Sequence, residues 1–479
     1  MKAMSNDKPQ GVCASDFASI VGEENAVCLW ENIEISQQKR IQQAISNEKP
    51  FSTRGCANGF AVAHGGNPQD RAGSPQGVYA SGNSPSCIVY PRTQQQLAAI
   101  IATAYTNNWR VLPCGSCSKL SWGGLAKGVD IVVSTERINQ LIEHAVGDLT
   151  VTVEPGMKFS DLQALLAKSR QFLAIDPTAP ESATIGGIVA TGDTGSLRQR
   201  YGSVRDQLLG ITFVRADGQV AKAGGRVVKN VAGYDLMKLL TGSYGTLGFI
   251  SQLTFRVYPL PEASGTVVLT GSAEAVSQAA DILRGSALTP VQADLLSTKL
   301  VSSLGLGEGL GLIARFQSIS ESVKEQSNRV LEVGQKLGLN GAIFVDGDEA
   351  NLWQRLQKRI HTTATESVIT CKIGVLPTAA VEILTQVELG LIHISSGLGL
   401  LQLEDKNQVL KVRDELCSGG GDRTQANRGF LTILEAPVAV KEQIDVWGYT
   451  GNALPLMRRI KEQFDSKNIL SPGRFVGGI

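Results

Sequence analysis

The sequence predicts an α+β protein with more than one domain, and three observations support this. Its 479 residues exceed what a single hydrophobic core usually organises. Segments rich in β-branched residues alternate with amphipathic segments of helical period. Glycine is abundant, at 52 residues, and much of it gathers in a few short phrases. We therefore expect a backbone that turns tightly against a ligand, because glycine tolerates conformations that other residues avoid.

Bulk composition argues against several classes of function. The 45 basic and 44 acidic residues leave a net charge of +1, which gives no support to nucleic-acid or anionic-membrane binding. The start of the chain lacks the apolar core of a secretory signal, and no apolar run reaches the ~18 residues of a membrane span. The eight cysteines are mostly scattered, as is typical of reduced thiols. We expect a cytoplasmic protein that would meet a membrane only through partners.

The first 84 residues are predicted to form a helical extension followed by a flexible loop. Ile35, Ile41 and Ile45 recur at nearly helical spacing, which predicts a largely helical stretch over residues 15–48. Residues 52–86 are rich in Gly, Ser, Asn and Pro, a composition typical of a long surface loop or a disordered insertion.

From residue 87 the pattern becomes strand, helix, strand. Cys87–Tyr90 and Trp109–Leu112 are predicted strands, and Thr93 is placed to cap the helix between them. The next predicted elements are strands within 130–139 and 149–156, a capped helix over 159–168, a hairpin over 211–220 that turns at Asp217-Gly218, and a strand over 253–257.

The second half of the chain predicts another domain. Strands and helices alternate between about residues 263 and 455. The last segment predicts a helix with Leu456, Ile460 and Phe464 on one face.

The first phrase that carries chemistry is a loop directly after a predicted strand. Successive backbone N–H groups in such a loop can converge on a diphosphate, and they cost no side-chain entropy. An ordinary glycine turn is the plain alternative. The candidate residues are Pro113, Cys114, Gly115, Ser116, Cys117, Ser118 and Lys119.

The same loop has a rival interpretation, because Cys114 and Cys117 form a CxxC motif. Such a pair is typical of a thioredoxin-like redox site or of half a zinc site. Zinc needs a second pair of ligands, and Cys371 and Cys417 lie far apart without local histidines. Thioredoxin chemistry needs the motif at a helix N-terminus, and residues 120–124 do not resemble a helix.

The second phrase runs from Asp176 to Gly195. The paired Gly186 and Gly187 allow backbone to lie against a planar ring, and the Thr184 hydroxyl can bond ring carbonyls or phosphate. A glycine-rich bend in a buried crossover is the alternative.

Two further phrases follow in order, KNVAGYDL over 229–236 and GSYGTLGFI over 242–250. The ordered set resembles the FAD-binding domain of the vanillyl-alcohol oxidase and p-cresol methylhydroxylase (PCMH) type, and within it the FAD-binding E subunits of bacterial glycolate oxidases. The ending NILSPGR over 468–474 also resembles that family, with Ser471 in place of an asparagine. The resemblance is strong over about 85–260, good over 456–474, and loose between them.

The resemblance implies a fold and a cofactor. We expect a two-subdomain PCMH-type FAD-binding domain over 85–261, an α/β cap over 262–455, and a C-terminal segment over 456–479 that packs back on the FAD domain. FAD should be held noncovalently, because the cofactor loop has no histidine. Besides the loop residues 113–119, the implied FAD contacts are Pro177, Thr178, Thr184, Gly186, Gly187, Ala190, Thr191, Gly192 and the backbone of Ile250.

The sequence also departs from the catalytic D-2-hydroxyacid dehydrogenases of this superfamily. Val228 and Ala232 stand where those enzymes carry an Arg and a Thr that grip the substrate carboxylate, and whether Arg226 substitutes is open. Their metal-binding H-x-G-D-G-N-x-H phrase is reduced here to a single His393, which we expect to be a core or interface residue. No metal site and no catalytic residue is predicted.

The resemblance implies the FAD-binding subunit of a glycolate oxidase or dehydrogenase complex. Its chemistry would be hydride transfer from a 2-hydroxy acid to flavin, with a catalytic D-type flavoprotein and an iron–sulfur F-type subunit as partners. The alternatives are a stand-alone FAD-dependent oxidoreductase of another hydroxy acid or alcohol, and a noncatalytic FAD-binding assembly subunit. We expect the chain alone to oxidise glycolate or D-lactate poorly.

Overall fold

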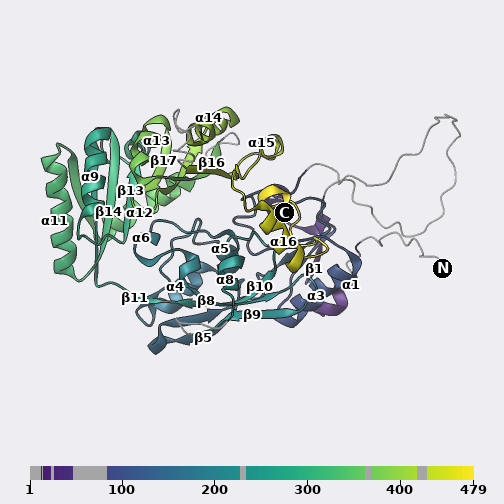
Figure 1. Ribbon diagram of the computed structural model, residues 1–479. Coiled ribbons are helices and arrows are strands. Elements are labelled where there is room, and N and C mark those ends of the chain that lie inside the picture. Colours follow the sequence, from purple (N-terminus) through teal and green to yellow (C-terminus); the bar gives the residue numbers. More distant parts are fainter. Residues whose placement is uncertain are drawn as a thin grey trace, which may run out of the picture.

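Three main β-sheets and the helices around them make up the described part of this α+β protein (Figure 1). The structure is a computed structural model that describes residues 12, 15–22, 26–46, 84–226, 233–361, 368–417 and 429–479. Residues 52–83 of the loop predicted over 52–86 lie outside these residues, as do Val228, Lys229 and Ala232.

The first sheet has four strands in the order β1-β2-β4-β3. Strands β2, β4 and β3 are parallel, and β1 pairs antiparallel with β2. Helix α3 covers this sheet with its buried apolar stripe, and the Thr93 hydroxyl caps it by accepting from the Gln96 N–H at 3.1 Å, as predicted. The bounds are β1 Val27–Leu29, β2 Cys87–Val89, β3 Val111–Cys114, β4 Ile131–Ser134 and α3 Gln94–Asn107.

The prediction of a largely helical stretch over 15–48 is only partly right. Two short helices, α1 (Ser15–Val21) and α2 (Ile35–Gln42), flank the strand β1. Ile41 and Ile45 are buried, but Ile35 is 69 % exposed. The helical spacing of apolar residues therefore begins at Ile35, before the buried face itself begins.

The second sheet is antiparallel, with the strand order β5-β6-β10-β8-β9. The predicted hairpin is confirmed, since β8 and β9 pair around a turn in which Gly218 has a φ of +84°. Helices α4, α5 and α8 pack their apolar residues against this sheet. The bounds are β5 Leu141–Ala145, β6 Thr150–Val153, β8 Leu208–Val214, β9 Val220–Gly224, β10 Phe249–Arg256, α4 Phe159–Ala167, α5 Ile185–Thr191 and α8 Leu236–Leu240, with a small pair of β7 Gln171–Phe172 and β11 Tyr258–Pro259 alongside.

The third sheet forms the cap and has eight antiparallel strands in the order β15-β12-β14-β13-β17-β18-β16-β19. Helices α9, α11, α13 and α14 bury one face of it, and α10 and α12 pack on the other. The strands are β12 Ala263–Gly271, β13 Gln292–Leu296, β14 Leu310–Ser318, β15 Asn340–Val345, β16 Ile369–Val375, β17 Leu389–His393, β18 Leu398–Leu403 and β19 Gly429–Glu435.

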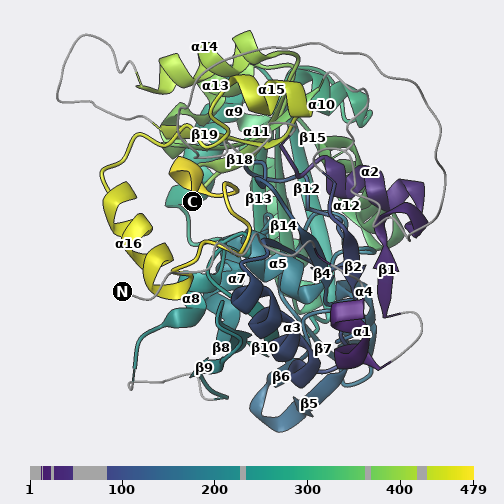
Figure 2. The same ribbon diagram turned by 90° about the vertical axis from the view of Figure 1, so that its right-hand side faces the viewer.

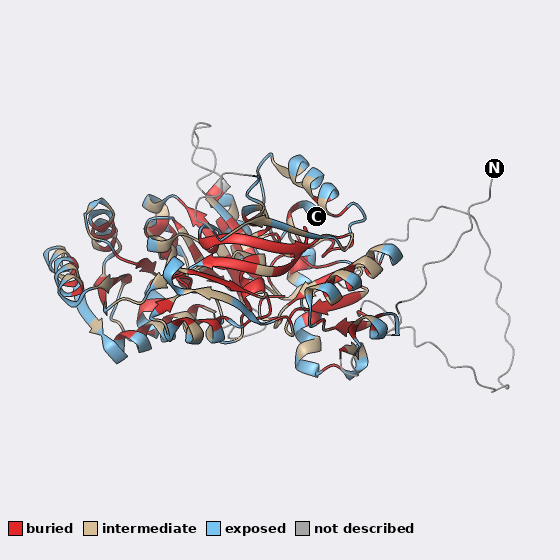
Figure 3. Cartoon of the chain, turned by 90° about the horizontal axis from the view of Figure 1, so that it is seen from below, coloured by how far each residue is buried: buried red, intermediate tan, exposed pale blue. Residues whose placement is uncertain are grey.

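Figure 3 shows that buried residues concentrate in the strands, whereas exposed residues lie mainly on the helices. The cap helices include α12, which faces the segment 191–198. Their bounds are α9 Ala273–Gly285, α10 Thr298–Ser303, α11 Ser320–Lys336, α12 Asp346–His361, α13 Ala380–Gln386, α14 Lys406–Cys417 and α15 Val438–Gln443.

The end of the chain returns from the cap to the first sheet (Figure 2). Helix α16 (Leu454–Phe464) precedes a segment whose backbone at Leu470 bridges to Val111 of β3. Ile460 and Phe464 pack on the core of the second sheet, whereas Leu456 is exposed, so the predicted apolar face is shorter than its spacing suggested.

Two buried cationic side chains, Lys461 and Arg474, hold this C-terminal segment in place. The Lys461 ammonium donates to the carbonyls of Thr246 and Leu470, at 2.9 and 2.8 Å. The Arg474 guanidinium donates to the carbonyls of Leu120 and Trp122, at 2.9 and 2.7 Å. These contacts fix the segment that follows the loop 113–119.

Candidate cofactor and substrate site

The loop 113–119 leaves β3 and turns against the start of α5. The Ser116 hydroxyl donates to the Ser182 carbonyl at 2.5 Å. Thr184 caps α5 by accepting from the Gly187 N–H at 3.3 Å. A Cβ on Gly115 would lie 2.2 Å from the Thr184 hydroxyl oxygen, so a side chain there would displace the cap. Gly186 and Gly187 lie in the first turn of helix α5. The sequence pattern predicted a flat wall or a bend at this position and did not predict a helix.

A pocket of about 90 Å³ lies between this loop, α5 and the segment 243–250. The Gly187 position faces open space, because a Cβ there would meet only the Thr184 hydroxyl within 4 Å. The predicted FAD contacts that line this pocket are Pro113, Cys114, Gly115, Ser116, Cys117, Ser118, Lys119, Thr184, Gly186, Gly187, Ala190, Thr191 and Ile250.

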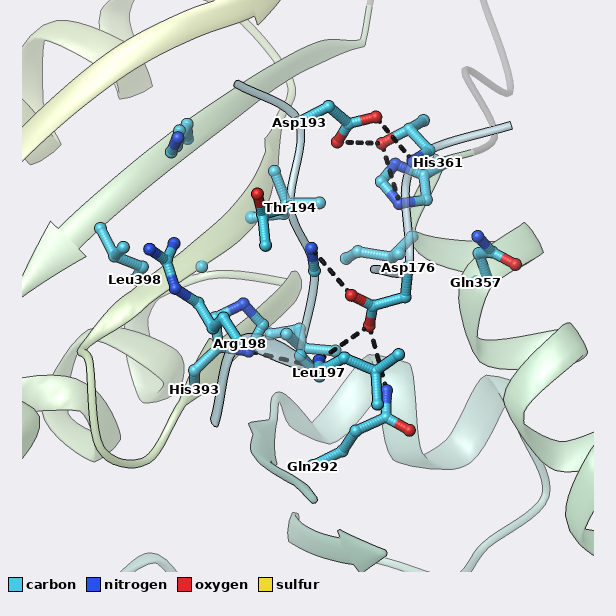
Figure 4. A pocket seen from close by; sticks show the side chains of 18 of the residues that line it. Asp176, Asp193, Thr194, Leu197, Arg198, Gln292, Gln357, His361, His393 and Leu398 are labelled. Atoms are coloured by element: carbon cyan, nitrogen blue, oxygen red, sulfur yellow. Dashed lines mark hydrogen bonds between the residues drawn. The ribbon is translucent and has the colours of Figure 1, made fainter. Parts of the chain in front are cut away.

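A second cavity, of about 340 Å³, adjoins the first and shares Thr191 and Tyr244 with it. It lies between the segment 191–198 and the cap, where α12 and strands β13, β16, β17 and β18 supply its walls (Figure 4). The predicted contacts Thr178 and Gly192 line this cavity. Pro177 lines neither pocket, and its carbonyl accepts from the Gln357 amide at 2.8 Å.

His393 stands at the end of β17 in the wall of the second cavity, and it is not a lone histidine. Its Nδ1 lies 2.6 Å from a carboxylate oxygen of the fully buried Asp294 on β13. The Ser196 hydroxyl lies 3.3 Å from the same ring nitrogen and also donates to Asp294. The sequence around His393 has no acid, and the pairing of β13 with β17 supplies one. This arrangement was missed because 99 residues separate the two groups.

A buried ion pair, Lys119 with Asp193, connects the two pockets. The buried Lys119 ammonium lies 3.2 Å from the Asp193 carboxylate but makes no well-aligned hydrogen bond to any described residue. Asp193 also accepts from the Thr178 N–H at 2.8 Å, and the Thr178 hydroxyl lies 3.5 Å from Nε2 of His361. Burial lowers the pKa of His361 to about 4, because it disfavours the imidazolium form.

Asp176 holds the chain segment that forms the floor of the cavity. Its carboxylate accepts from the N–H groups of Gly195 and Leu197, at 3.1 and 3.0 Å, and from the Gln292 amide at 3.1 Å (Figure 4). Burial raises the pKa of Asp176 to about 7, against the effect of these donors. A group that titrates near neutrality inside a cavity is a feature of functional sites.

The structure bears on the rival interpretation of Cys114 and Cys117. Both thiols are free and buried, and they belong to the apolar cluster on the outer side of the first sheet. The hydrogen bond from Cys117 and burial together raise the pKa of Cys114 well above its ordinary range. A reactive thiol needs a lowered pKa, so this environment disfavours nucleophilic redox chemistry.

Two exposed residues lie away from both pockets. Arg226 pairs with Glu143 at 2.7 Å on the surface and lines neither pocket. Tyr234 is 89 % exposed and lines neither pocket. In the described part of the chain, no group of three or more His, Cys, Asp or Glu residues is placed to hold a metal ion, and no helix is long and apolar enough to cross a membrane.

Residues 85–224 match a family model described as an FAD binding domain. The chain is 25 % identical to a probable mitochondrial D-lactate dehydrogenase of Danio rerio, over 88 % of this chain and 90 % of that protein. It is 24 % identical to a D-2-hydroxyglutarate dehydrogenase of Stutzerimonas stutzeri, over 82 % and 91 %. Glycolate oxidase subunit GlcD of Bacillus subtilis is 29 % identical over 44 % of this chain, which spans 45 % of that protein's length.

Solved structures show what the fold is like. A p-cresol methylhydroxylase with bound substrate matches 96 % of this chain and 95 % of its own, at 15 % identity and a TM-score of 0.64. An alkyldihydroxyacetonephosphate synthase matches 81 % and 77 %, at 17 % identity and a TM-score of 0.61. At such low sequence identity, these matches support only a similarity of fold. The fold is that of a two-subdomain PCMH-type FAD-binding domain with a cap, as predicted.

The chain carries an FAD-binding domain, and its cofactor is FAD. The smaller pocket fits such a group on physical grounds. The Gly187 position leaves room for a planar or anionic ligand, and the buried Lys119 ammonium retains unused hydrogen-bonding capacity.

Proposed function

We propose that this chain oxidises a small 2-hydroxy acid with FAD. The observation that carries the proposal is the adjacency of two different pockets, joined at Thr191 and Tyr244. One is lined by glycine and backbone, as a cofactor requires, and the other by titratable side chains, as a reacting substrate requires. The names of the relatives, D-lactate and D-2-hydroxyglutarate dehydrogenases, support the substrate class.

The proposed cofactor contacts are the loop 113–119, the segment 177–192 and the backbone of Ile250. We further propose that residues 85–261 and 456–479 carry FAD and that residues 262–455 form the cap over the substrate. The binding is noncovalent in this proposal, because no residue of the loop is a histidine.

When bound, FAD would accept a hydride, which carries both electrons of the oxidation, from the substrate carbon. The protein must then remove the hydroxyl proton. Asp294 accepts from Nδ1 of His393, which leaves Nε2 of the neutral ring as the proton acceptor. Asp294 also stabilises the imidazolium that forms, so the proton resides on His393 after the transfer.

The remaining groups position this acceptor and limit access of water. Asp176 fixes the segment 195–197, and through it Ser196 beside the dyad. The walls that exclude water are formed by Trp122, Trp353, Leu391, Leu398 and Leu400.

We also propose that the chain works as the FAD-binding subunit of a glycolate oxidase-type complex, with D-type and F-type partners. The phrases over 229–236 and 242–250, together with the likeness to a glycolate oxidase subunit, support this. A stand-alone enzyme is the second candidate. The proton acceptor inside this chain and the nearly full-length match to a D-lactate dehydrogenase favour it.

The experiment is anaerobic mixing of the full FAD-loaded chain with glycolate, D-lactate, D-2-hydroxyglutarate and, as a neutral control, 1-propanol. We expect the 450 nm flavin absorbance to bleach with a hydroxy acid and to persist with the alcohol. Bleaching that requires added D-type partner supports the complex, and bleaching without it supports the stand-alone enzyme. Failure of every acid under both conditions would refute the proposed reaction.

A further inference from the structure

Two cationic side chains in the wall of the larger cavity form no ion pair with any described residue. Arg198 begins α6 (Arg198–Tyr201), and Lys372 lies in the middle of β16, paired with Leu400 of β18. Both line the cavity. Among the described residues, neither side chain has a hydrogen-bond or ion-pair partner. Figure 4 places the Arg198 guanidinium on the same side of the cavity as His393 and Leu398.

The other charged groups of the cavity are already paired. Lys119 lies 3.2 Å from Asp193, and His393 lies 2.6 Å from Asp294. Arg315, the other arginine in the wall, pairs with Glu349 at 3.0 Å. Asp176 accepts from two backbone N–H groups and the Gln292 amide. Arg198 and Lys372 therefore face the cavity without an ion-pair partner among the described residues.

Leaving these two cations unpaired costs free energy. Burial lowers the pKa of Lys372, and the nearby Arg198 guanidinium lowers it further by repulsion, against the weaker opposing effect of Asp193. Burial also lowers the pKa of Arg198, and the carboxylates of Asp206 and Asp176 offset this only in part. A bound anion would relieve both the desolvation and the repulsion, so the pair is suited to an anionic ligand.

We infer that Arg198 and Lys372 bind the carboxylate of the substrate. This moves the carboxylate grip from the segment 226–232, where its equivalents are replaced, to α6 and β16. It rests on the proposed function, since the anion is taken to be the 2-hydroxy acid itself. With the carboxylate held at this pair, the neighbouring hydroxyl is directed toward His393 on the same wall. A neutral alcohol lacks the group that fixes this orientation.

Binding of oxalate tests the inference, because oxalate carries carboxylates but no C–H bond to oxidise. We would measure its dissociation constant by titration of the flavin absorbance and by calorimetry on the full FAD-loaded chain. Arg198→Gln and Lys372→Gln should each weaken oxalate about 10- to 100-fold, in line with the loss of a charge-assisted hydrogen bond. Arg226→Gln, the same change at an exposed surface pair, should leave it unchanged.

Arg198→Lys guards against a folding failure, because it keeps the charge and loses only the planar fork. It should bind oxalate with intermediate affinity. FAD content and the melting temperature of every variant are measured alongside, and neither should change by much. Unchanged oxalate affinity in folded, FAD-loaded Arg198→Gln and Lys372→Gln would overturn the inference. A parent chain that binds no oxalate and is bleached by neutral alcohols would instead refute the proposed function.

Discussion

The two adjoining pockets differ in the kind of residues that line them. The smaller pocket takes most of its walls from three short stretches, 113–120, 184–191 and 243–250, in which glycines and small side chains are frequent. The larger cavity combines the stretch 191–198 with side chains of α12, β13, β16, β17 and β18, which come from distant parts of the chain. Replacing a side chain should therefore matter little in the first, unless it adds bulk. In the second it should matter a great deal.

The largest expected effect is on cofactor binding, from bulk placed where only backbone should be. Gly187→Val adds a side chain that meets only the Thr184 hydroxyl, at 3.1 Å from its Cβ, and otherwise fills the smaller pocket. We expect the apoprotein to fold with nearly the parent melting temperature and to lose FAD affinity by 100-fold or more, because the cofactor and the side chain compete for one space. Flavin released by acid from purified protein reports occupancy.

The matched control is Gly285→Val at the end of α9. That position is exposed, and a Cβ there meets nothing within 4 Å. Equal FAD affinity in both variants and the parent would refute the proposal that the backbone at Gly187 lies against the cofactor.

The next largest effect is on chemistry, from a side chain in the larger cavity. His393→Gln removes the proposed proton acceptor and should slow flavin reduction by a hydroxy acid about 10²- to 10⁴-fold. FAD content and oxalate affinity should change much less. His144→Gln is the control, because His144 bonds Gln171 at 2.8 Å outside both pockets.

FAD content and the melting temperature separate loss of the proton acceptor from structural damage. In His393→Gln both should stay close to the values of the parent, while flavin reduction is slowed. A parent-like rate in the variant would end the role given to His393.

The same contrast explains what could be predicted from sequence. The Thr93 cap, the Asp217-Gly218 turn and the glycine phrases depend on residues within a few positions of each other, and the first two are confirmed in detail. The loop and α5 do meet in one pocket, although Gly186 and Gly187 turned out to begin a helix.

The larger cavity was not predictable in this way. Asp294 and His393 become partners only because β13 pairs with β17, and nothing in either local phrase indicates that register. His361 meets Thr178 at the end of a cap helix, across 183 residues. Periodicity predicts which face of a strand is buried, but not which distant strand lies beside it.

A smaller effect concerns the pH dependence of stability. Burial raises the pKa of Asp176 to about 7, whereas an unfolded chain has an aspartate near 3.8. The folded state therefore holds the proton more tightly, and stability falls as pH rises from about 4 to about 7. Asp176→Asn should lose this slope. Urea unfolding measures the free energy of unfolding at pH 5 and at pH 8. Between these two pH values, this free energy should fall by on the order of 2 kcal/mol more in the parent than in the variant. Equal slopes would contradict this environment for Asp176.

The smallest effect is expected from a side chain in the pocket that acts through its backbone. Cys114 lines the smaller pocket, yet its thiol is buried in the cluster with Ile88, Leu112 and Val132. Cys114→Ser places a hydroxyl among apolar groups, which should cost about 1–2 kcal/mol of unfolding free energy. FAD affinity and the rate of flavin reduction should stay within twofold of the parent, because the backbone of the loop is unchanged. Loss of turnover with FAD retained would revive a redox role for the Cys114 and Cys117 pair. It would also mean that the cofactor pocket, like the cavity beside it, depends on the chemistry of its side chains.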